Sequence, residues 1–176
     1  MKDLITADTG PLIALARINL LPLLSRLFNR VIVPSSVFKE ACAELNKSGA
    51  KAILAASENT WFQCVPVDSE AEQSNHSLTK ALSVLDRGER DVIILAKQLN
   101  TIALIDEKRG RKVANITGVH CIGTAAILIK LKEKQLIDSV SPYLDQLADT
   151  GYRLSAELIR KVRVLAGESG NKSRHS

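Results

Sequence analysis

The chain has 176 residues, of which 45% are hydrophobic. This is enough for one compact domain with a substantial core and argues against a second independent domain. Its 24 Lys and Arg residues outnumber its 19 Asp and Glu residues, and the formal net charge of +5 favours an anionic partner without requiring one. Aromatic residues make up only 3% of the chain, which argues against a row of base-stacking platforms.

The sequence carries no pattern of export or membrane insertion. A strand-like run begins almost at Met1, with no basic segment followed by a long apolar one. No stretch approaches the roughly 20 consecutive apolar residues that a helix needs to span a bilayer. The three cysteines, Cys42, Cys64 and Cys121, lack metal-site spacing and predict reduced, mostly buried thiols. We therefore expect a soluble, cytoplasmic protein with no membrane partner.

The first half of the chain alternates short apolar runs with helical periodicity. Pro34 stops the second predicted strand, and Ser35 and Ser36 are expected to cap the helix after it. The predicted elements are strand Leu4–Ala7, helix Leu12–Ile18, helix Leu20–Phe28, strand Val31–Val33, a helix from Ser35 to about Lys47, helix Ala50–Glu58 and strand Phe62–Val65.

The second half continues the alternation after a polar segment, Asp68–Ser77, that predicts a loop. The predicted elements are helices Leu78–Leu85 and Gly88–Leu99, strand Thr101–Ile105, helix Glu107–Ile116, strand Val119–Ile122, and helices Thr124–Lys134, Pro142–Asp149 and Ala156–Leu165. Since parallel strands need helical crossovers, the pattern predicts the α/β class, as a three-layer α/β/α sandwich with a mainly parallel central sheet. We expect one domain over residues 1–167 and a disordered tail over residues 168–176, which are small and polar.

Acidic residues occur where such a sheet would place a site. Asp8 and Asp106 each follow a predicted strand directly, and ligands of open parallel sheets bind beyond the carboxyl ends of the strands. Glu89 and Asp91 stand at the start of one helix, and Glu40 lies in the first two turns of another. Five carboxylates could therefore converge.

Each of these residues also has a purely structural explanation. Asp8 and Asp106 could cap the helices that follow them, and Asp86 with Glu89 fits a capping box. Asp91 would be favoured by the helix dipole. Glu40 and Glu44, four residues apart, could form a solvated face.

Their joint placement favours a metal site. Clustered carboxylates repel one another unless a cation neutralises them, and hard oxygen ligands select Mg²⁺ or Mn²⁺. His76, His120 and His175 offer no zinc spacing. A divalent metal would lower the pKa of a bound water and stabilise charge on a phosphoryl group, which predicts phosphodiester hydrolysis.

The chain resembles PIN-domain nucleases, and in particular VapC-like toxins of type II toxin–antitoxin systems. The resemblance covers about residues 3–166 and is specific as an ordered set, although each piece alone is weak. The matching segments are Ile5–Leu15, Val33–Glu40, Leu85–Asp91, Leu104–Glu107 with Arg109–Ala114, and Gly123-Thr124.

This resemblance implies a three-layer sandwich whose acidic site binds Mg²⁺ or Mn²⁺ for endonucleolytic RNA cleavage. By position it implies that Asp8, Glu40, Asp91 and Asp106 form the acidic quartet and bind the metal, although either Glu89 or Asp91 could face it. The hydroxyls that would support these ligands are those of Thr9, beside the first Asp, and Thr124. It further implies a small antitoxin partner and a possible homodimer.

A basic run follows Asp106 immediately and could hold phosphates on either side of the scissile one. Its residues are Lys108, Arg109, Arg111 and Lys112. The alternative is a solvated helix face. The low aromatic content favours an RNA substrate recognised by its shape and a flipped-out loop.

Three other classes are the alternatives to a nuclease. A receiver-like phosphoacceptor domain would want an acidic pair near Asp8 and a Lys after the last strand, where Gly123-Thr124 stands instead. A phosphatase with an Asp-x-Asp motif is disfavoured because Gly10 occupies the second acidic position. A PIN-like module that binds RNA or protein without cleaving would lack one or more metal ligands, whereas all are present here.

Overall fold

The computed structural model describes residues 4–68 and 76–168, with His76 and Ser77 described for their backbone alone. The chain divides into two compact units, residues 1–124 and 125–176. The predicted loop Asp68–Ser77 lies largely outside the described residues, apart from its ends. The predicted extent of a single domain over residues 1–167 stays a prediction.

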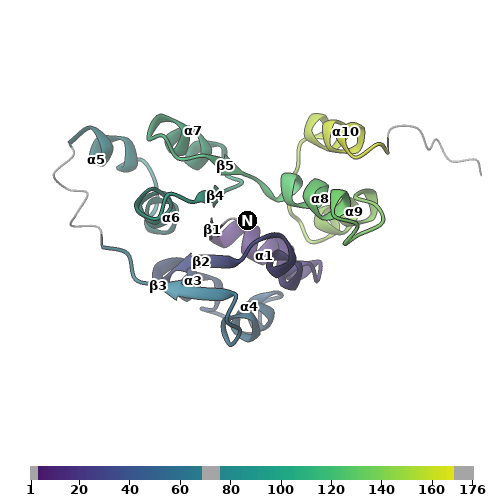
Figure 1. Cartoon of the computed structure of the whole chain (residues 1–176), viewed down its shortest axis with the longest axis horizontal. Coiled ribbons are helices and arrows are strands. Elements are labelled where there is room, and N and C mark those ends of the chain that lie inside the picture. The colour runs from purple at the N-terminus through teal and green to yellow at the C-terminus, as the bar shows by residue number, and fades with distance from the viewer. Residues whose placement is uncertain (1–3, 69–75, 169–176) are drawn as a thin grey trace, which may run out of the picture. The chain divides into compact units, whose positions relative to one another are not determined.

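The first unit is built on a five-stranded sheet in the order β3-β2-β1-β4-β5, with every pair parallel (Figure 1). The strands are β1 (Leu4–Ala7), β2 (Arg30–Pro34), β3 (Phe62–Val65), β4 (Ile102–Leu104) and β5 (Cys121–Ile122). β1 lies at the centre and pairs with β2 on one side and β4 on the other. The predicted parallel sheet is confirmed.

Helices cover both faces of this sheet. They are α1 (Thr9–Arg17), the 3-10 helix η1 (Leu21–Leu23), α2 (Leu24–Leu27), α3 (Ser35–Ala41), α4 (Ala50–Ser57), α5 (His76–Leu82), α6 (Arg87–Gln98) and α7 (Lys108–Ile116). Figure 1 shows α1 and α6 on opposite sides of the strands; α1 contacts α4, and α6 contacts α7. The unit is therefore the predicted three-layer α/β/α sandwich.

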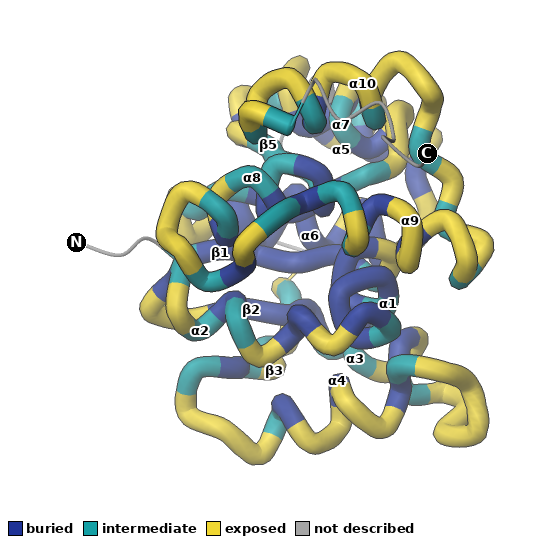
Figure 2. Tube along the Cα trace, turned by 90° about the vertical axis from the view of Figure 1, so that its right-hand side faces the viewer, coloured by how far each residue is buried: buried dark blue, intermediate teal, exposed yellow. Residues whose placement is uncertain are grey.

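The core lies between the strands and these helices. Ile5, Val31 and Leu104 are fully buried on three neighbouring strands, as expected for strands covered on both faces. Figure 2 shows β1 and β2 as buried over most of their length. Leu15 of α1 and Ile93 of α6 complete the packing from the helical layers.

The structure corrects several predicted details of this unit. The helix predicted to run from Ser35 to Lys47 ends at Ala41, and its N-cap is Pro34, so the serines do not cap it. The single helix predicted over Leu20–Phe28 is η1 followed by α2. The three cysteines are free thiols, but none is fully buried and Cys64 is exposed. Elsewhere the predicted elements differ from the observed ones by a few residues at their ends.

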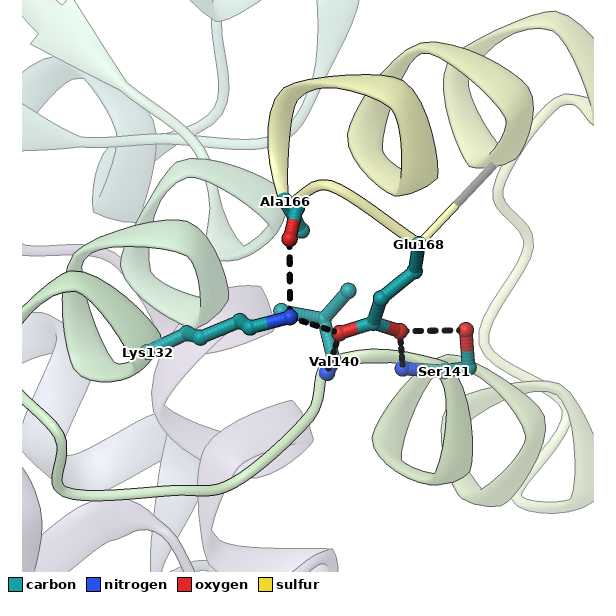
Figure 3. A network of polar contacts seen from close by, with 5 residues as sticks. All are labelled: Lys132, Val140, Ser141, Ala166 and Glu168. Atoms are coloured by element: carbon teal, nitrogen blue, oxygen red, sulfur yellow. Dashed lines mark hydrogen bonds and ion pairs between the residues drawn. The ribbon is translucent and has the colours of Figure 1, made fainter. Parts of the chain in front are cut away.

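The second unit is helical in its described part. It contains α8 (Thr124–Glu133), except for Thr124, which belongs to the first unit, and the helices α9 (Ser141–Asp149) and α10 (Ala156–Leu165). The carboxylate of Glu168 joins the three helices (Figure 3). It pairs with Lys132 Nζ at 2.7 Å and accepts from the backbone N–H groups of Val140 and Ser141 at 2.7 and 2.9 Å. The prediction of a disordered tail is therefore wrong for Glu168. Residues 169–176 of that predicted tail lie outside the described residues.

No single helix in residues 4–68 and 76–168 is long and apolar enough to cross a membrane. Only α1 together with the segment Leu21–Leu27 passes that test of length and composition, and the two are bent by 114° at the break between them. Leu12, Leu15, Leu21 and Leu24 of this pair are fully buried in the core.

Candidate active site

The carboxyl ends of β1 and β4 meet at one edge of the sheet. Asp8 follows β1, and its backbone N–H donates to the carbonyl of Leu104 at 3.1 Å, which continues the pairing one residue past the strand. Asp8 occupies the N-cap position of α1 but makes no side-chain capping hydrogen bond. Capping of α1 therefore does not account for the Asp8 carboxylate.

An acidic cavity of about 420 Å³ opens beside Asp8. Its lining combines carboxylates from four segments of the chain with one cation. The lining residues are Asp8, Thr9, Gly10, Glu40, Asp86, Glu89, Glu107 and Arg109. The structure thus brings together Asp8, Glu40 and Glu89 as predicted.

Local hydrogen bonds orient two of these carboxylates. Thr9 Oγ1 donates to Glu40 Oε2 at 3.0 Å. The sequence predicts that this hydroxyl supports Asp8, whereas in the structure it supports Glu40. Asp86 and Glu89 form a reciprocal capping box at the start of α6, in which the backbone N–H of Glu89 donates to Asp86 Oδ1 at 2.9 Å. The predicted capping box is confirmed, and both of its members nevertheless line the cavity.

Glycine permits the close approach of α7 to this site. A side chain at Gly110 would lie 3.0 Å from Ile105 Cγ2 and 3.2 Å from Glu89 Oε1. The first turn of α7 therefore lies directly against Glu89, and any larger residue at position 110 would displace one of them.

Asp91 and Asp106 are not among the residues that line the cavity. Ser36 Oγ donates to Asp91 Oδ2 at 2.5 Å, and Arg87 lies 3.8 Å from the same oxygen. Thr124 donates to Asp106 twice, from its backbone N–H at 2.8 Å and from Oγ1 at 2.6 Å. Asp106 is not the N-cap of α7, because Glu107 occupies that position. Between Glu89 and Asp91, the geometry favours Glu89 as the cavity-facing group.

The cavity concentrates negative charge with little compensation. Burial raises the pKa of Asp8 to about 7; the backbone N–H of Thr9 lowers it in part, while Glu89, Asp86 and Glu40 raise it. Burial also raises the pKa of Glu89, and the charges of Asp86 and Glu107 act in the same direction. Arg109 opposes the shift of Glu89. A cation bound in the cavity would offset this repulsion.

The donor set fits a hard divalent cation in chemistry. Its ligand atoms would be carboxylate oxygens, which suit Mg²⁺ or Mn²⁺. Among residues 4–68 and 76–168, however, no three His, Cys, Asp or Glu side chains form a group that could hold a metal ion as they lie. Coordination would therefore require the side chains of Asp8, Glu40 and Glu89 to converge further.

The predicted basic residues separate into two kinds. Arg109 lines the cavity and donates from Nη1 to the carbonyl of Val84 at 3.1 Å. Arg111 donates from Nη1 to the carbonyl of Ile105 at 3.1 Å, which ties α7 to the end of β4. Lys108 and Lys112 are exposed, one turn apart on α7. Arg109 is thus the basic residue best placed to meet a phosphate in the cavity.

Sequence reasoning missed three residues around the site. The sequence predicts only a capping role for Asp86 and for Ser36. It predicts Glu107 only as the first residue of a helix. The one local signal for Glu107 was its place directly after a strand-end carboxylate. The contact of Ser36 with Asp91 joins residues 55 apart and has no local signal.

A larger cavity, of about 500 Å³, lies at the opposite edge of the sheet, where β1 and β4 begin. Among the residues that the structure describes, its lining includes Leu4, Lys97, Asn100 and His120 and no carboxylate. It therefore lacks the carboxylate ligands of the acidic cavity. Because ligands of parallel sheets bind beyond the carboxyl ends of the strands, the acidic cavity beside Asp8 is the better candidate site.

Residues 4–168 match a family model described as PIN domain. This range spans the sheet, the acidic cavity and the helices α8 to α10. None of the curated proteins compared matches the chain.

Proposed function

Because the chain belongs to the PIN-domain family, we propose that it is a metal-dependent endoribonuclease that hydrolyses RNA phosphodiester bonds at the acidic cavity. PIN domains are generally nucleases and typically use divalent metals. Family membership also removes the receiver-like alternative. The RNA specificity and the identity of the ion, Mg²⁺ or Mn²⁺, belong to this proposal.

One observation carries the proposal. Asp8 is only 8% exposed, lies at the carboxyl end of the central strand, and shares one cavity with Glu40 and Glu89. A fold that served structure alone would gain from pairing such a carboxylate with a cation of its own. The uncompensated charge instead favours a bound divalent ion.

The chain's own residues would divide the work as follows. Asp8, Glu40 and Glu89 would hold the metal, and Thr9 would orient Glu40 through the 3.0 Å hydrogen bond. When bound, the ion would supply charge stabilisation at the phosphoryl group and a more acidic water. Arg109 would bind a non-bridging oxygen of the phosphate in the cavity. Lys108 and Lys112 would hold neighbouring phosphates of the strand.

We further propose that the protein is the toxin of a type II toxin–antitoxin pair. The support is the resemblance of Ile5–Leu15, Leu85–Asp91 and the other matching segments to VapC-like toxins. This proposal includes a small antitoxin partner, a possible homodimer and a cytoplasmic location. A short reading frame beside this gene would support it.

Cleavage of structured RNA by the purified full chain tests the proposed activity. The assay compares Mg²⁺ or Mn²⁺ with EDTA, and the wild type with Asp8→Asn. We expect cleavage that requires metal and falls by at least about 100-fold in the variant. The exposed carboxylate Asp149 provides a matched control, and Asp149→Asn should cleave as the wild type does. Equal cleavage by Asp8→Asn would contradict the site, and a folded wild type that neither binds metal nor cleaves would favour a binding-only module.

A further inference from the structure

Two adjacent carboxylates leave the end of β4, and they are in different surroundings. From this difference we propose that Glu107, and not Asp106, is the carboxylate that the segment between β4 and α7 contributes to the metal-binding cavity. The inference rests on the proposed function, because it concerns the ligands of the same site.

Both oxygens of Asp106 are already engaged inside the fold. Oδ1 accepts from the backbone N–H of Thr124 and Oδ2 from Thr124 Oγ1, and Thr124 is fully buried. The Cβ position that a side chain at Gly123 would occupy lies 2.6 Å from Oδ1 and 3.2 Å from Arg111 Nη1. Asp106, which is half-buried, thus lies against Thr124 and Gly123 at the start of α8.

Hydrogen bonds alone do not disqualify a carboxylate as a ligand, because ligating carboxylates are commonly oriented by such donors. The decisive difference is position. Glu107 lines the acidic cavity with Asp8, Glu40 and Glu89, whereas Asp106 does not. In the observed conformation, therefore, Glu107 faces the cavity, while the carboxylate of Asp106 is turned to Thr124.

Two further observations place Glu107 at the site. It occupies the N-cap position of α7, yet its side chain makes no capping hydrogen bond, so helix α7 does not hold the carboxylate. Its charge also acts on Glu89, which is one of the central carboxylates of the cavity. Gly110 permits α7 to lie against Glu89, so Glu107, at the start of α7, enters the same cavity as Glu40 of α3.

Asp106 then has a positioning role. Its two hydrogen bonds fix the chain just after β4 to Thr124, and the Arg111 guanidinium ties α7 to the carbonyl of Ile105. Together these contacts set where the following residues, Glu107 and Arg109, enter the cavity. Loss of Asp106 should therefore loosen the site without removing a ligand.

Mn²⁺ binding to the full chain without RNA, measured by calorimetry, distinguishes the two roles. We expect Glu107→Gln to weaken Mn²⁺ binding at least about tenfold while leaving the melting temperature in EDTA unchanged. Asp106→Asn should lower that melting temperature and weaken Mn²⁺ binding less than Glu107→Gln does. Glu58→Gln, at an exposed carboxylate that does not line the cavity, is the matched control and should bind as the wild type does.

The possible results separate this inference from the proposed function. If the wild type binds Mn²⁺ and cleaves RNA but Glu107→Gln binds as tightly as the wild type, the inference is wrong and the proposed function stands. A larger loss of affinity in Asp106→Asn than in Glu107→Gln would overturn it as well. Glu107→Asp keeps the charge on a shorter side chain, and recovery of part of the affinity there would support a direct ligand.

Discussion

Asp8 in the first unit and Glu168 in the second are two carboxylates in opposite electrostatic surroundings. Asp8 is 8% exposed and the Glu168 side chain 14%. Burial raises the pKa of Asp8 to about 7, and the neighbouring carboxylates raise it too. Burial would also raise the pKa of Glu168, but hydrogen bonds from Lys132, Ser141 and Val140 outweigh it and hold that pKa at about 2.

The two carboxylates differ in the donors that surround them. Glu168 receives an ammonium, a hydroxyl and two backbone N–H groups, so its charge is satisfied within the fold (Figure 3). Asp8 faces Glu40 and Glu89 across a cavity. A carboxylate whose charge the fold compensates stabilises the structure, whereas one with few donors and several carboxylates nearby is available to a cation.

The largest effect on stability is expected from Asp8→Asn in EDTA. The native state binds a proton at Asp8 more tightly than the unfolded state, so the wild type loses stability as the pH rises from about 4 to about 7. Asn carries no charge, and the variant should therefore be more stable at pH 8, by an amount on the order of a few kcal/mol. Urea unfolding at pH 4 and pH 8 measures this difference.

At pH 4 the two proteins should unfold at similar urea concentrations, because Asp8 is then protonated in the native state. Asp149→Asn, at an exposed carboxylate, is the control for the substitution itself. A variant no more stable than the wild type at pH 8 would mean that the charge of Asp8 is compensated within the metal-free protein.

Glu168→Gln should have the opposite sign. Since the native state holds the carboxylate ionised, Glu168 contributes stability that is present above about pH 4.5 and is lost as the pH falls toward about 2. Removing the charge should lower the free energy of unfolding at neutral pH by about 1 to 3 kcal/mol, with solvent screening favouring the lower figure. Thermal unfolding at pH 7 and pH 2.5 tests the loss, with the exposed Glu133→Gln as its control. An equal loss at both pH values would point to packing and not to charge.

The sequence predicted those features that depend on neighbours along the chain. The apolar run Val31–Val33 predicted a buried strand, and the spacing of Asp86 and Glu89 predicted a capping box. The strand-end position of Asp8 predicted a candidate site, and a cavity that Asp8 lines lies at that position. These signals are local, so one sequence is enough to find them.

Contacts between distant segments decided the remainder. Ser36 was expected to cap its own helix, but Asp91, 55 residues away, accepts its hydroxyl hydrogen bond. Glu168 was assigned to a tail because its neighbours in sequence are small and polar, while its partner Lys132 lies 36 residues earlier. Which of Asp106 and Glu107 reaches the cavity depends on Thr124, 18 residues further along. Composition and periodicity do not encode such pairings.

The smallest effect is expected from Ser141→Ala, which separates the hydroxyl from the other donors to Glu168. The substitution removes the 2.6 Å hydrogen bond from Ser141 Oγ to Oε2, but the backbone N–H of residue 141 and the Lys132 ammonium remain. A loss of about 0.5 to 1.5 kcal/mol in the free energy of unfolding is expected, measured at pH 7 beside Glu168→Gln. The double variant should lose less than the sum of the two single losses, because both act on one network. If Ser141→Ala alone lowers the free energy of unfolding as much as Glu168→Gln does, the hydroxyl and not the charge holds this carboxylate. The contrast with Asp8 would then rest on the neutral hydrogen-bond donors and not on the Lys132 cation.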